Sequence, residues 1–212
     1  MNSEALRELL QSLEYKGISD PRVLDAFART PREVFISERT LKPHAYTDEA
    51  LPIECEQTIS QPFIVAYMTE RLHVMPYLDV LEIGTGSGFQ TAILARLAKK
   101  VYTIERHLEL HKLAVRRFEH LGLRNITAIH GDGTKGWRES RLFDRIIVTA
   151  GTKQAPGALL DQLAPCGFLI IPLGPRCDQR ITLITRNDGR EDYQSLLSVR
   201  FVPLLQDMVD SA

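Results

Sequence analysis

The sequence predicts an α/β fold, in which a doubly wound, mostly parallel sheet follows an N-terminal helical extension. Three observations predict this class. Short apolar runs alternate with segments of helical period from residue 78 onward. One of these runs leads into a glycine-rich turn, as in ligand-binding sheets of this kind. The chain has 212 residues, of which 44% are hydrophobic, and this suits one compact α/β domain with an extension.

The N-terminal third is expected to contain three helices and a long loop. Asp20-Pro21 is a typical N-cap and first-turn pair for the second helix, which must stop before Pro31. Residues 31–62 contain four prolines and are expected to be mostly loop, and a third helix is expected over 63–74. The first helix is indicated by leucines at helical spacing that end near Gly17, namely Leu6, Leu9, Leu10 and Leu13.

Seven strands are expected in the rest of the chain. The first five alternate with segments of helical period, which implies right-handed crossovers and a parallel sheet with helices on both faces. The last two are separated by Asn187-Asp188-Gly189, a turn signal typical of an antiparallel hairpin, here at the edge of the sheet. The strands are expected near residues 78–83, 101–105, 126–130, 143–149, 167–173, 181–186 and 195–202.

The glycine turn Gly84-Thr85-Gly86-Ser87-Gly88 indicates a nucleotide-like ligand, because bare backbone between a strand and a helix allows close approach. The dinucleotide fingerprint has its third glycine one residue later, where this chain has Phe89. Glu82, two residues before the first glycine, would repel a pyrophosphate but suits a ligand with an ammonium or sulfonium group. S-adenosylmethionine has both groups and no phosphate.

Two further acids follow the next two expected strands. Glu105 lies about 20 residues after the first glycine, where a carboxylate accepts the ribose hydroxyls in doubly wound sheets. Asp132 follows the strand at 126–130, where an acid can accept the adenine amino group. Each acid alone is compatible with a surface position, but three at successive strand ends share the edge where such sheets bind ligands. These residues therefore predict an S-adenosylmethionine site.

Other classes are excluded by composition and spacing. The formal net charge of −1 gives no electrostatic footprint for nucleic acid or an anionic membrane, and no apolar run approaches membrane-spanning length. Residues 1–15 show an amphipathic helix pattern without a signal peptide, so a cytoplasmic protein is expected. No metal site is predicted: His107 and His111 are interpreted as part of a solvated helix face. The cysteines are expected to be free thiols, with Cys166 buried beside a strand.

More selective segments accompany the glycine turn, above all Gln57-Thr58-Ile59-Ser60-Gln61-Pro62. Others are Gly131-Asp132-Gly133, Phe143-Asp144-Arg145-Ile146-Ile147-Val148-Thr149-Ala150 and Val199-Arg200-Phe201-Val202-Pro203-Leu204. Through these segments the chain resembles the protein-L-isoaspartate O-methyltransferase family over most of its length. The resemblance implies a Rossmann-like, seven-stranded class I methyltransferase core at 77–212, with helices and a substrate loop at 1–76 packed on it as one compact structural domain.

The resemblance further implies that a methyl group passes from S-adenosylmethionine to the isoaspartyl carboxylate of damaged peptides and proteins, with S-adenosylhomocysteine as product. Ser60 is implied as the active-site serine, in a segment that lies over the methyl donor. The alternative interpretation of Ser60 is an N-cap for the helix after Pro62, since serine is a preferred cap. A monomer is expected. The residues and the resemblance together give the candidate cofactor-binding set: Thr58, Glu82, Gly84, Thr85, Gly86, Ser87, Gly88, Glu105, Asp132 and Gly133.

The chemistry of this reaction requires little of the side chains. A carboxylate is ionised at neutral pH, so no general base is needed, and catalysis is expected to rest on alignment and on exclusion of water. Two alternatives stay open, a methyltransferase for another peptide or small acid and a non-catalytic adaptor that binds the cofactor. Position 56 is commonly glycine in the family, and here Glu54 and Glu56 either weaken the capture of an anionic substrate or point outward.

Overall fold

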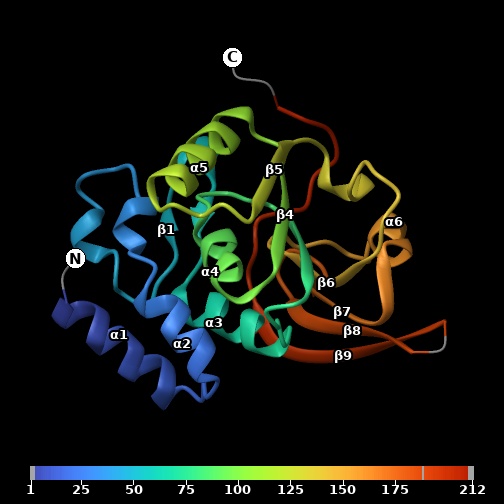
Figure 1. Cartoon of the computed structure of the whole chain (residues 1–212), viewed down its shortest axis with the longest axis horizontal. Helices are drawn as coiled ribbons and strands as arrows, with labels where there is room; N and C mark the ends of the chain where they lie inside the picture. Colours follow the sequence, from blue (N-terminus) through green and yellow to red (C-terminus); the bar gives the residue numbers. More distant parts are fainter. Residues whose placement is uncertain (1–2, 188, 210–212) are drawn as a thin grey trace.

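The computed structural model describes residues 3–187 and 189–209. A seven-stranded sheet lies at its centre, with the strands in the spatial order β5-β4-β3-β6-β7-β8-β9 (Figure 1). β3 to β7 are parallel to one another, whereas β8 pairs antiparallel with both β7 and β9. The predicted, mostly parallel fold is therefore confirmed. The strands are β3 (Asp79–Ile83), β4 (Lys100–Glu105), β5 (Ile126–His130), β6 (Phe143–Val148), β7 (Leu163–Leu173), β8 (Gln179–Asn187) and β9 (Arg190–Val199).

The helices divide unequally between the two faces of the sheet. Alternate strand residues face opposite sides, so Val80 packs toward the large helical layer while Leu81 packs toward the smaller one. The large layer contains α1 (Ser3–Tyr15), α2 (Pro21–Ala28), α3 (Pro62–Arg71) and α4 (Phe89–Leu97), and α5 (Leu108–His120) packs on β4 and β5. The opposite face carries α6 (Gly157–Asp161), of five residues, and the buried ring of Trp137. No helix among the described residues has the length and apolar character that crossing a membrane requires.

The segment expected as a loop, 31–62, contains short elements that the sequence did not indicate. These are the 3-10 turns η1 (Arg32–Phe35), η2 (Lys42–His44) and η3 (Glu54–Glu56), and the strands β1 (Leu51–Pro52) and β2 (Thr58–Ile59). β1 and β2 form a small antiparallel hairpin with η3 at its tip. Two-residue strands leave no periodic signal, so their existence depends on contacts with the rest of the chain.

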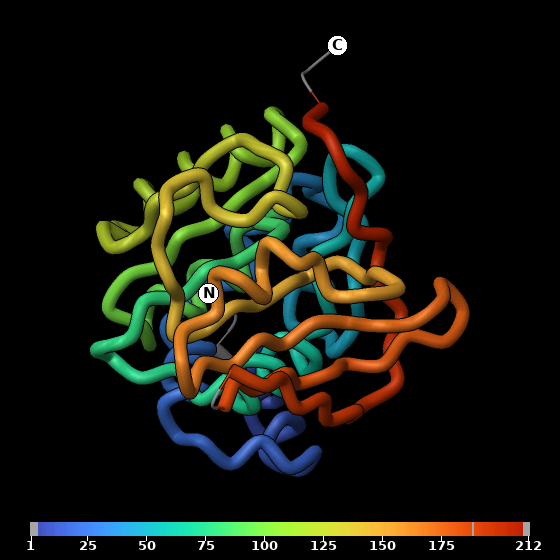
Figure 2. The backbone as a smooth tube through the Cα atoms, turned by 90° about the vertical axis from the view of Figure 1, so that its right-hand side faces the viewer, coloured from blue at the N-terminus to red at the C-terminus, as the bar shows by residue number. Residues whose placement is uncertain are grey.

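The expected edge hairpin is formed by β8 and β9, where Asn187 pairs with Arg190. Asp188 of the expected turn lies outside the described residues. The expected bounds of the last strand, 195–202, were wrong, since β9 runs from Arg190 to Val199. Its first half is exposed and polar because it lies at the sheet edge, and this hid the strand period. The chain then crosses the strand ends, with bridges from Pro203 to Gly151 and from Val209 to His107 (Figure 2).

Two further expectations were wrong. The segment between β5 and β6 contains only the 3-10 turn η4 (Gly133–Lys135) and no α-helix. Cys166, expected to be buried, is exposed and has a φ of 59°, because the start of β7 is irregular where its pairing with β6 shifts register. All three cysteines are free thiols.

Candidate active site

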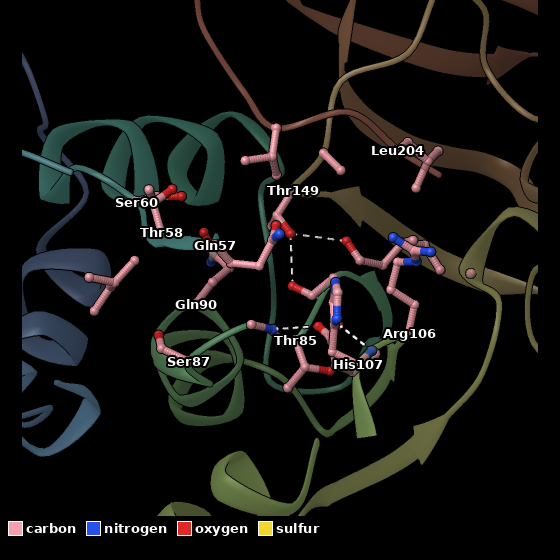
Figure 3. Close-up of a pocket in the computed structure, with 18 of the residues that line it drawn as sticks. Gln57, Thr58, Ser60, Thr85, Ser87, Gln90, Arg106, His107, Thr149 and Leu204 are labelled. Atoms are coloured by element: carbon pink, nitrogen blue, oxygen red, sulfur yellow. Dashed lines mark hydrogen bonds between the residues drawn. The ribbon is translucent and has the colours of Figure 1, made fainter. Parts of the chain in front are cut away.

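A cavity of about 290 Å³ opens where β3 and β4 end. Three parts of the chain that are distant in sequence form its walls: the glycine turn after β3, residues 56–60 of the N-terminal extension, and the C-terminal residues 202–205. Figure 3 shows Thr58 and Ser60 on one side of the cavity, and Thr85 and His107 on the other. The topology therefore brings the two segments that the sequence analysis singled out into one site.

Most of the predicted site residues line this cavity: Thr58, Ser60, Gly84, Thr85, Gly86, Ser87, Glu105 and Gly133. Three do not, namely Glu82, Gly88 and Asp132. All three lie directly beside lining residues in the sequence. The carboxyl groups of Glu82 and Asp132 accept hydrogen bonds from other residues of the protein, and Gly88 packs closely against Phe118.

Two glycines of the turn are required for different reasons. Gly84 has a φ of 95°, and a Cβ there would lie 2.4 Å from Thr149 Oγ1. Gly88 begins α4 with a φ of 90°, and a Cβ there would lie 2.7 Å from the ring of Phe118 in α5. Gly88 was expected to contact the cofactor; it does not line the cavity, and it allows the start of α4 to approach α5 closely. Neither position accepts another residue without displacement of its neighbours.

Glu105 holds the end of β4 against the glycine turn. Its carboxylate accepts the backbone N–H of Gly86 at 2.8 Å on Oε2 and that of His107 at 2.9 Å on Oε1. A carboxylate has about four lone-pair positions, so two remain for ligand hydroxyls. Because Glu105 lines the cavity and is only 4% exposed, these positions are suited to a buried diol such as that of a ribose.

Glu82 was expected to face the positive groups of the ligand, but it is fully buried and points toward α4. Strand alternation explains the difference, because Ile83 faces the cavity and its neighbour must face the other way. Burial raises the pKa of Glu82 to about 8, against the opposing effect of hydrogen bonds from Thr91 and Thr103. Oε1 of this carboxyl group has no hydrogen-bond partner in the structure.

Glu82 is nevertheless connected to the cavity. Oε2 accepts the hydroxyl of Thr91 at 2.5 Å and that of Thr103 at 2.7 Å. Thr103 Oγ1 also lies 2.6 Å from Thr85 Oγ1. Since Thr103 has one hydroxyl proton and donates it to Glu82, Thr85 must be the donor to Thr103. Glu82 thereby fixes the rotamer of a glycine-turn residue that lines the cavity.

Asp132 was also expected to contact the ligand, and it lies beside the lining residue Gly133 without lining the cavity itself. Its Oδ1 accepts the N–H and the hydroxyl of Thr134, at 2.9 and 2.7 Å. Its Oδ2 accepts the N–H of Asp207 at 3.1 Å and pairs with Lys135 at 3.2 Å. Burial opposes ionisation of this carboxyl, but the hydrogen bonds outweigh it and lower the pKa of Asp132. Asp132 therefore caps η4 and holds the C-terminal segment, while Gly133 lines the cavity.

The hydroxyl of Ser60 has no hydrogen-bond partner within the described part of the chain, and Ser60 lines the cavity. The alternative interpretation of Ser60 as an N-cap is wrong. The N-cap position of α3 is Gln61, and Asp48 Oδ1 instead accepts the free N–H of Phe63 at 2.7 Å. The hydroxyl of Ser60 is thus available to a ligand.

Arg32 fixes the backbone that presents Ser60. This fully buried guanidinium donates to four carbonyl oxygens of the surrounding loop, those of Ala45 at 2.6 Å, Glu49 at 3.0 Å, Ser60 at 3.1 Å and Thr47 at 3.4 Å. Burial lowers the pKa of Arg32 to about 10, which still leaves the side chain charged at neutral pH. Backbone carbonyls accept its hydrogen bonds and the nearby charge of Asp48 favours its charged form, so the loop conformation depends on this arginine.

Glu56 lies on the cavity wall, whereas Glu54 does not. Glu56 is also exposed, so its carboxylate lies at the rim of the cavity. Cys55 and Glu56 have φ values of 57° and 55°, the left-handed region that favours glycine. A common glycine at this position in the family is therefore explained by backbone geometry, and in this chain Glu56 is held in a strained conformation.

The lining residues that the candidate set did not include are led by Gln90, Arg106, His107, Thr149, Arg176 and Leu204. The interpretation of His107 as part of a solvated helix face was wrong, since it occupies the N-cap position of α5 and lines the cavity. Thr149 directly follows β6 and donates to Gly84 O at 2.7 Å, so the rule that located acids at strand ends would also have found it. Among the described residues, no group of three or more His, Cys, Asp or Glu side chains is arranged to hold a metal ion.

Comparisons with known proteins place this site in a family. Residues 4–209 match the model of the protein-L-isoaspartate(D-aspartate) O-methyltransferase family. A protein-L-isoaspartate O-methyltransferase of Parvibaculum lavamentivorans is 53% identical over 202 residues, which cover 94% of this chain and 90% of the relative. One of Dictyoglomus turgidum is 50% identical over 198 residues, covering 93% and 90%.

Two similar solved structures have names that correspond to the same family. A protein-L-isoaspartate O-methyltransferase superposes with a TM-score of 0.85 at 29% identity; the match covers 93% of this chain and 65% of that longer chain. A beta-aspartate methyltransferase of Plasmodium falciparum, solved with S-adenosyl-L-homocysteine, superposes with a TM-score of 0.82 at 28% identity, covering 93% and 97%. The resemblance of the sequence motifs is thus confirmed over nearly the whole chain, which belongs to the protein-L-isoaspartate O-methyltransferase family.

Proposed function

We propose that this protein transfers the methyl group of S-adenosylmethionine to the isoaspartyl carboxylate of damaged peptides and proteins. The observation that carries the proposal is the meeting of the glycine turn and Glu105 with Thr58 and Ser60 in one cavity. The relatives named for this activity, matched over nine tenths of the chain, support it.

The residues of the cavity fit S-adenosylmethionine. Glu105 has two lone-pair positions for ribose hydroxyls, and Ile83, Ile104 and Gly133 form an apolar wall suited to adenine. Glu82 would act on the cofactor only through Thr103 and Thr85, not as a direct ligand. When bound, S-adenosylmethionine supplies an activated methyl group on a sulfonium leaving group.

Ser60 is proposed to hold one oxygen of the acceptor carboxylate by donating its unpartnered hydroxyl proton. Such a bond orients the carboxylate without abstracting a proton, which suits an acceptor that is already ionised. The C-terminal residues 202–205 form the opposite wall and exclude water from the same space. The proposed work of this chain is therefore alignment and shielding rather than acid–base catalysis.

The proposal for Ser60 is tested by Ser60→Ala. Loss of a hydrogen bond to a charged group costs about 1.5–3 kcal/mol, so kcat/KM for an isoaspartyl peptide should fall by about 10- to 150-fold. Binding of S-adenosylmethionine, measured by calorimetry, should stay within about twofold of the parent, since Ser60 contacts the acceptor. Ser140→Ala, at an exposed position outside the cavity, is the matched control. Equal turnover by both variants would refute the role.

We also propose that residues 1–76 and 77–212 form one structural domain. Their side chains share one core, in which Phe27 of α2 packs edge-on against Phe89 of α4 with ring centroids 5.6 Å apart. A single cooperative unfolding transition would support this, and two separated transitions would contradict it. The monomeric state and the cytoplasmic location stay predictions from the sequence.

A further inference from the structure

The geometry points to Arg176 as a specificity-determining residue that captures the carboxylate of the isoaspartyl substrate. The inference rests on the proposed function and deepens it, because it assigns the group that attracts the acceptor. Arg176 lies in the loop between β7 and β8, is exposed, and lines the cavity. Nothing in its sequence context marked it as a site residue.

The sheet order places Arg176 on the acceptor side of the cavity. Glu105 ends β4 and marks the proposed ribose end, whereas Arg176 follows β7. The order β4-β3-β6-β7 separates these strand ends by three spacings, or about 14 Å at roughly 4.8 Å each. The glycine turn follows β3 and lies between them. An acceptor that approaches the methyl group from the side opposite the ribose therefore passes Arg176.

The loop that carries Arg176 is anchored at both ends. The N–H of Gly174 donates to Thr152 O at 2.9 Å, which ties the loop to the segment after β6. Gln179, buried at the start of β8, accepts the N–H of Phe201 at 2.6 Å and ties it to the C-terminal segment. Arg176 is thus presented from a turn fixed to two other walls of the site.

Two arginines line the cavity: Arg106 directly follows β4, at the proposed ribose end, whereas Arg176 follows β7, at the acceptor end. The carboxylate of Glu105 accepts two backbone N–H groups, and Arg106 donates to Asp207 O at 3.2 Å. Within residues 3–187 and 189–209, Arg176 has no hydrogen bond or ion pair. The acceptor required by the proposed function is a carboxylate, and the planar guanidinium group matches its geometry.

Arg176 also distinguishes the substrate from the product by charge. Methyl transfer converts the acceptor carboxylate into a neutral ester, which no longer forms an ion pair with Arg176. The arginine therefore binds substrate in preference to product and favours release after transfer. A two-bond contact from Arg176 and one from Ser60 together use three of the about four lone-pair positions of the carboxylate, so one attacking lone pair remains.

The test is steady-state kinetics with an N-acetylated, C-amidated isoaspartyl peptide whose one charge is the isoaspartyl carboxylate. Arg176→Gln should raise its KM about fivefold at low salt, with kcat and the KM of S-adenosylmethionine unchanged. Arg176→Lys should restore most of the affinity. Salt should raise the KM of the parent but not that of Arg176→Gln. Arg190→Gln, at an exposed arginine that begins β9 and does not line the cavity, should match the parent.

Each other result has a distinct meaning. An unchanged KM for this peptide in Arg176→Gln, with normal turnover by the parent, would overturn the inference and leave the proposed function intact. An increase seen only with peptides that carry additional acidic residues would also overturn it, because Arg176 would then bind flanking residues. Absence of methyl transfer by the parent protein would refute the proposed function and the inference with it.

Discussion

Glu56→Gly is predicted to stabilise the protein, although it removes a side chain. Glu56 has a φ of 55°, and a residue other than glycine in that region costs about 1–2 kcal/mol. Relief of this strain is partly offset, because glycine increases the conformational entropy of the unfolded chain and so destabilises the folded state by about 0.4–1 kcal/mol. The net gain is about 0–1.6 kcal/mol, and its midpoint of about 0.8 kcal/mol raises the Tm of a chain of this size by about 2–3 °C.

The matched control is Glu49→Gly. Glu49 belongs to the same segment and is exposed, but its φ is not in the left-handed region, so only the entropic loss remains. Calorimetry or chemical denaturation should therefore show opposite signs for the two variants. Destabilisation of both by similar amounts would refute the assignment of strain to residue 56.

Charge and strain at residue 56 are separable. Because Glu56 lines the cavity, its carboxylate repels an anionic acceptor, and Glu56→Gly should lower the KM for acidic isoaspartyl peptides at low salt. Glu56→Gln removes the charge but keeps the side chain in the left-handed region. It should lower the KM equally while leaving the Tm close to that of the parent. Unchanged KM values in both variants would exclude an effect of Glu56 on substrate capture.

Three further predictions concern the cofactor side of the site. The pKa of Glu82 is raised from 4.5 to about 8, so between these pH values the folded state keeps a proton that the unfolded state loses. The free energy of unfolding therefore falls as the pH rises, by up to about 1.4 kcal/mol per pH unit. Glu82→Gln should flatten that slope in denaturation at pH 5 to 8, and an identical slope would contradict the buried neutral carboxyl. Glu105→Ala should weaken S-adenosylmethionine binding by at least about tenfold in calorimetry, since it removes the ribose acceptor and the support of Gly86, and unchanged affinity would exclude this role. Gly88→Ala should lower the Tm by several degrees because its Cβ would overlap the ring of Phe118, and an unchanged Tm would show that the close packing of α4 on α5 is not required.

Much of the fold was predictable from local sequence. Each parallel strand of the core is an apolar run followed by a segment of helical period or a clear turn, so its existence follows from periodicity. The exposed first half of β9 and the two-residue strands β1 and β2 lack such a period and were missed. These elements are stabilised by pairing with distant residues rather than by their own pattern.

The site was predictable where a residue's position in the chain fixes its place at a strand end. Glu105 was located in this way, and the motif around Ser60 added the opposite wall. The orientation of Glu82 and Asp132 was not predictable, because strand alternation shows that neighbours face opposite sides but not which side holds the ligand. Arg176 and the strained backbone at Glu56 depend on how distant loops meet, and no local pattern encodes this.

The central claim is that this cavity methylates isoaspartyl carboxylates. Its most direct test incubates the protein with labelled S-adenosylmethionine and two peptides of identical sequence, one with an aspartyl and one with an isoaspartyl linkage. The account predicts label on the isoaspartyl peptide alone, and labelling that is about 10- to 150-fold slower in Ser60→Ala. Equal labelling of both peptides, or bound S-adenosylmethionine with no labelling of the isoaspartyl peptide, would contradict it.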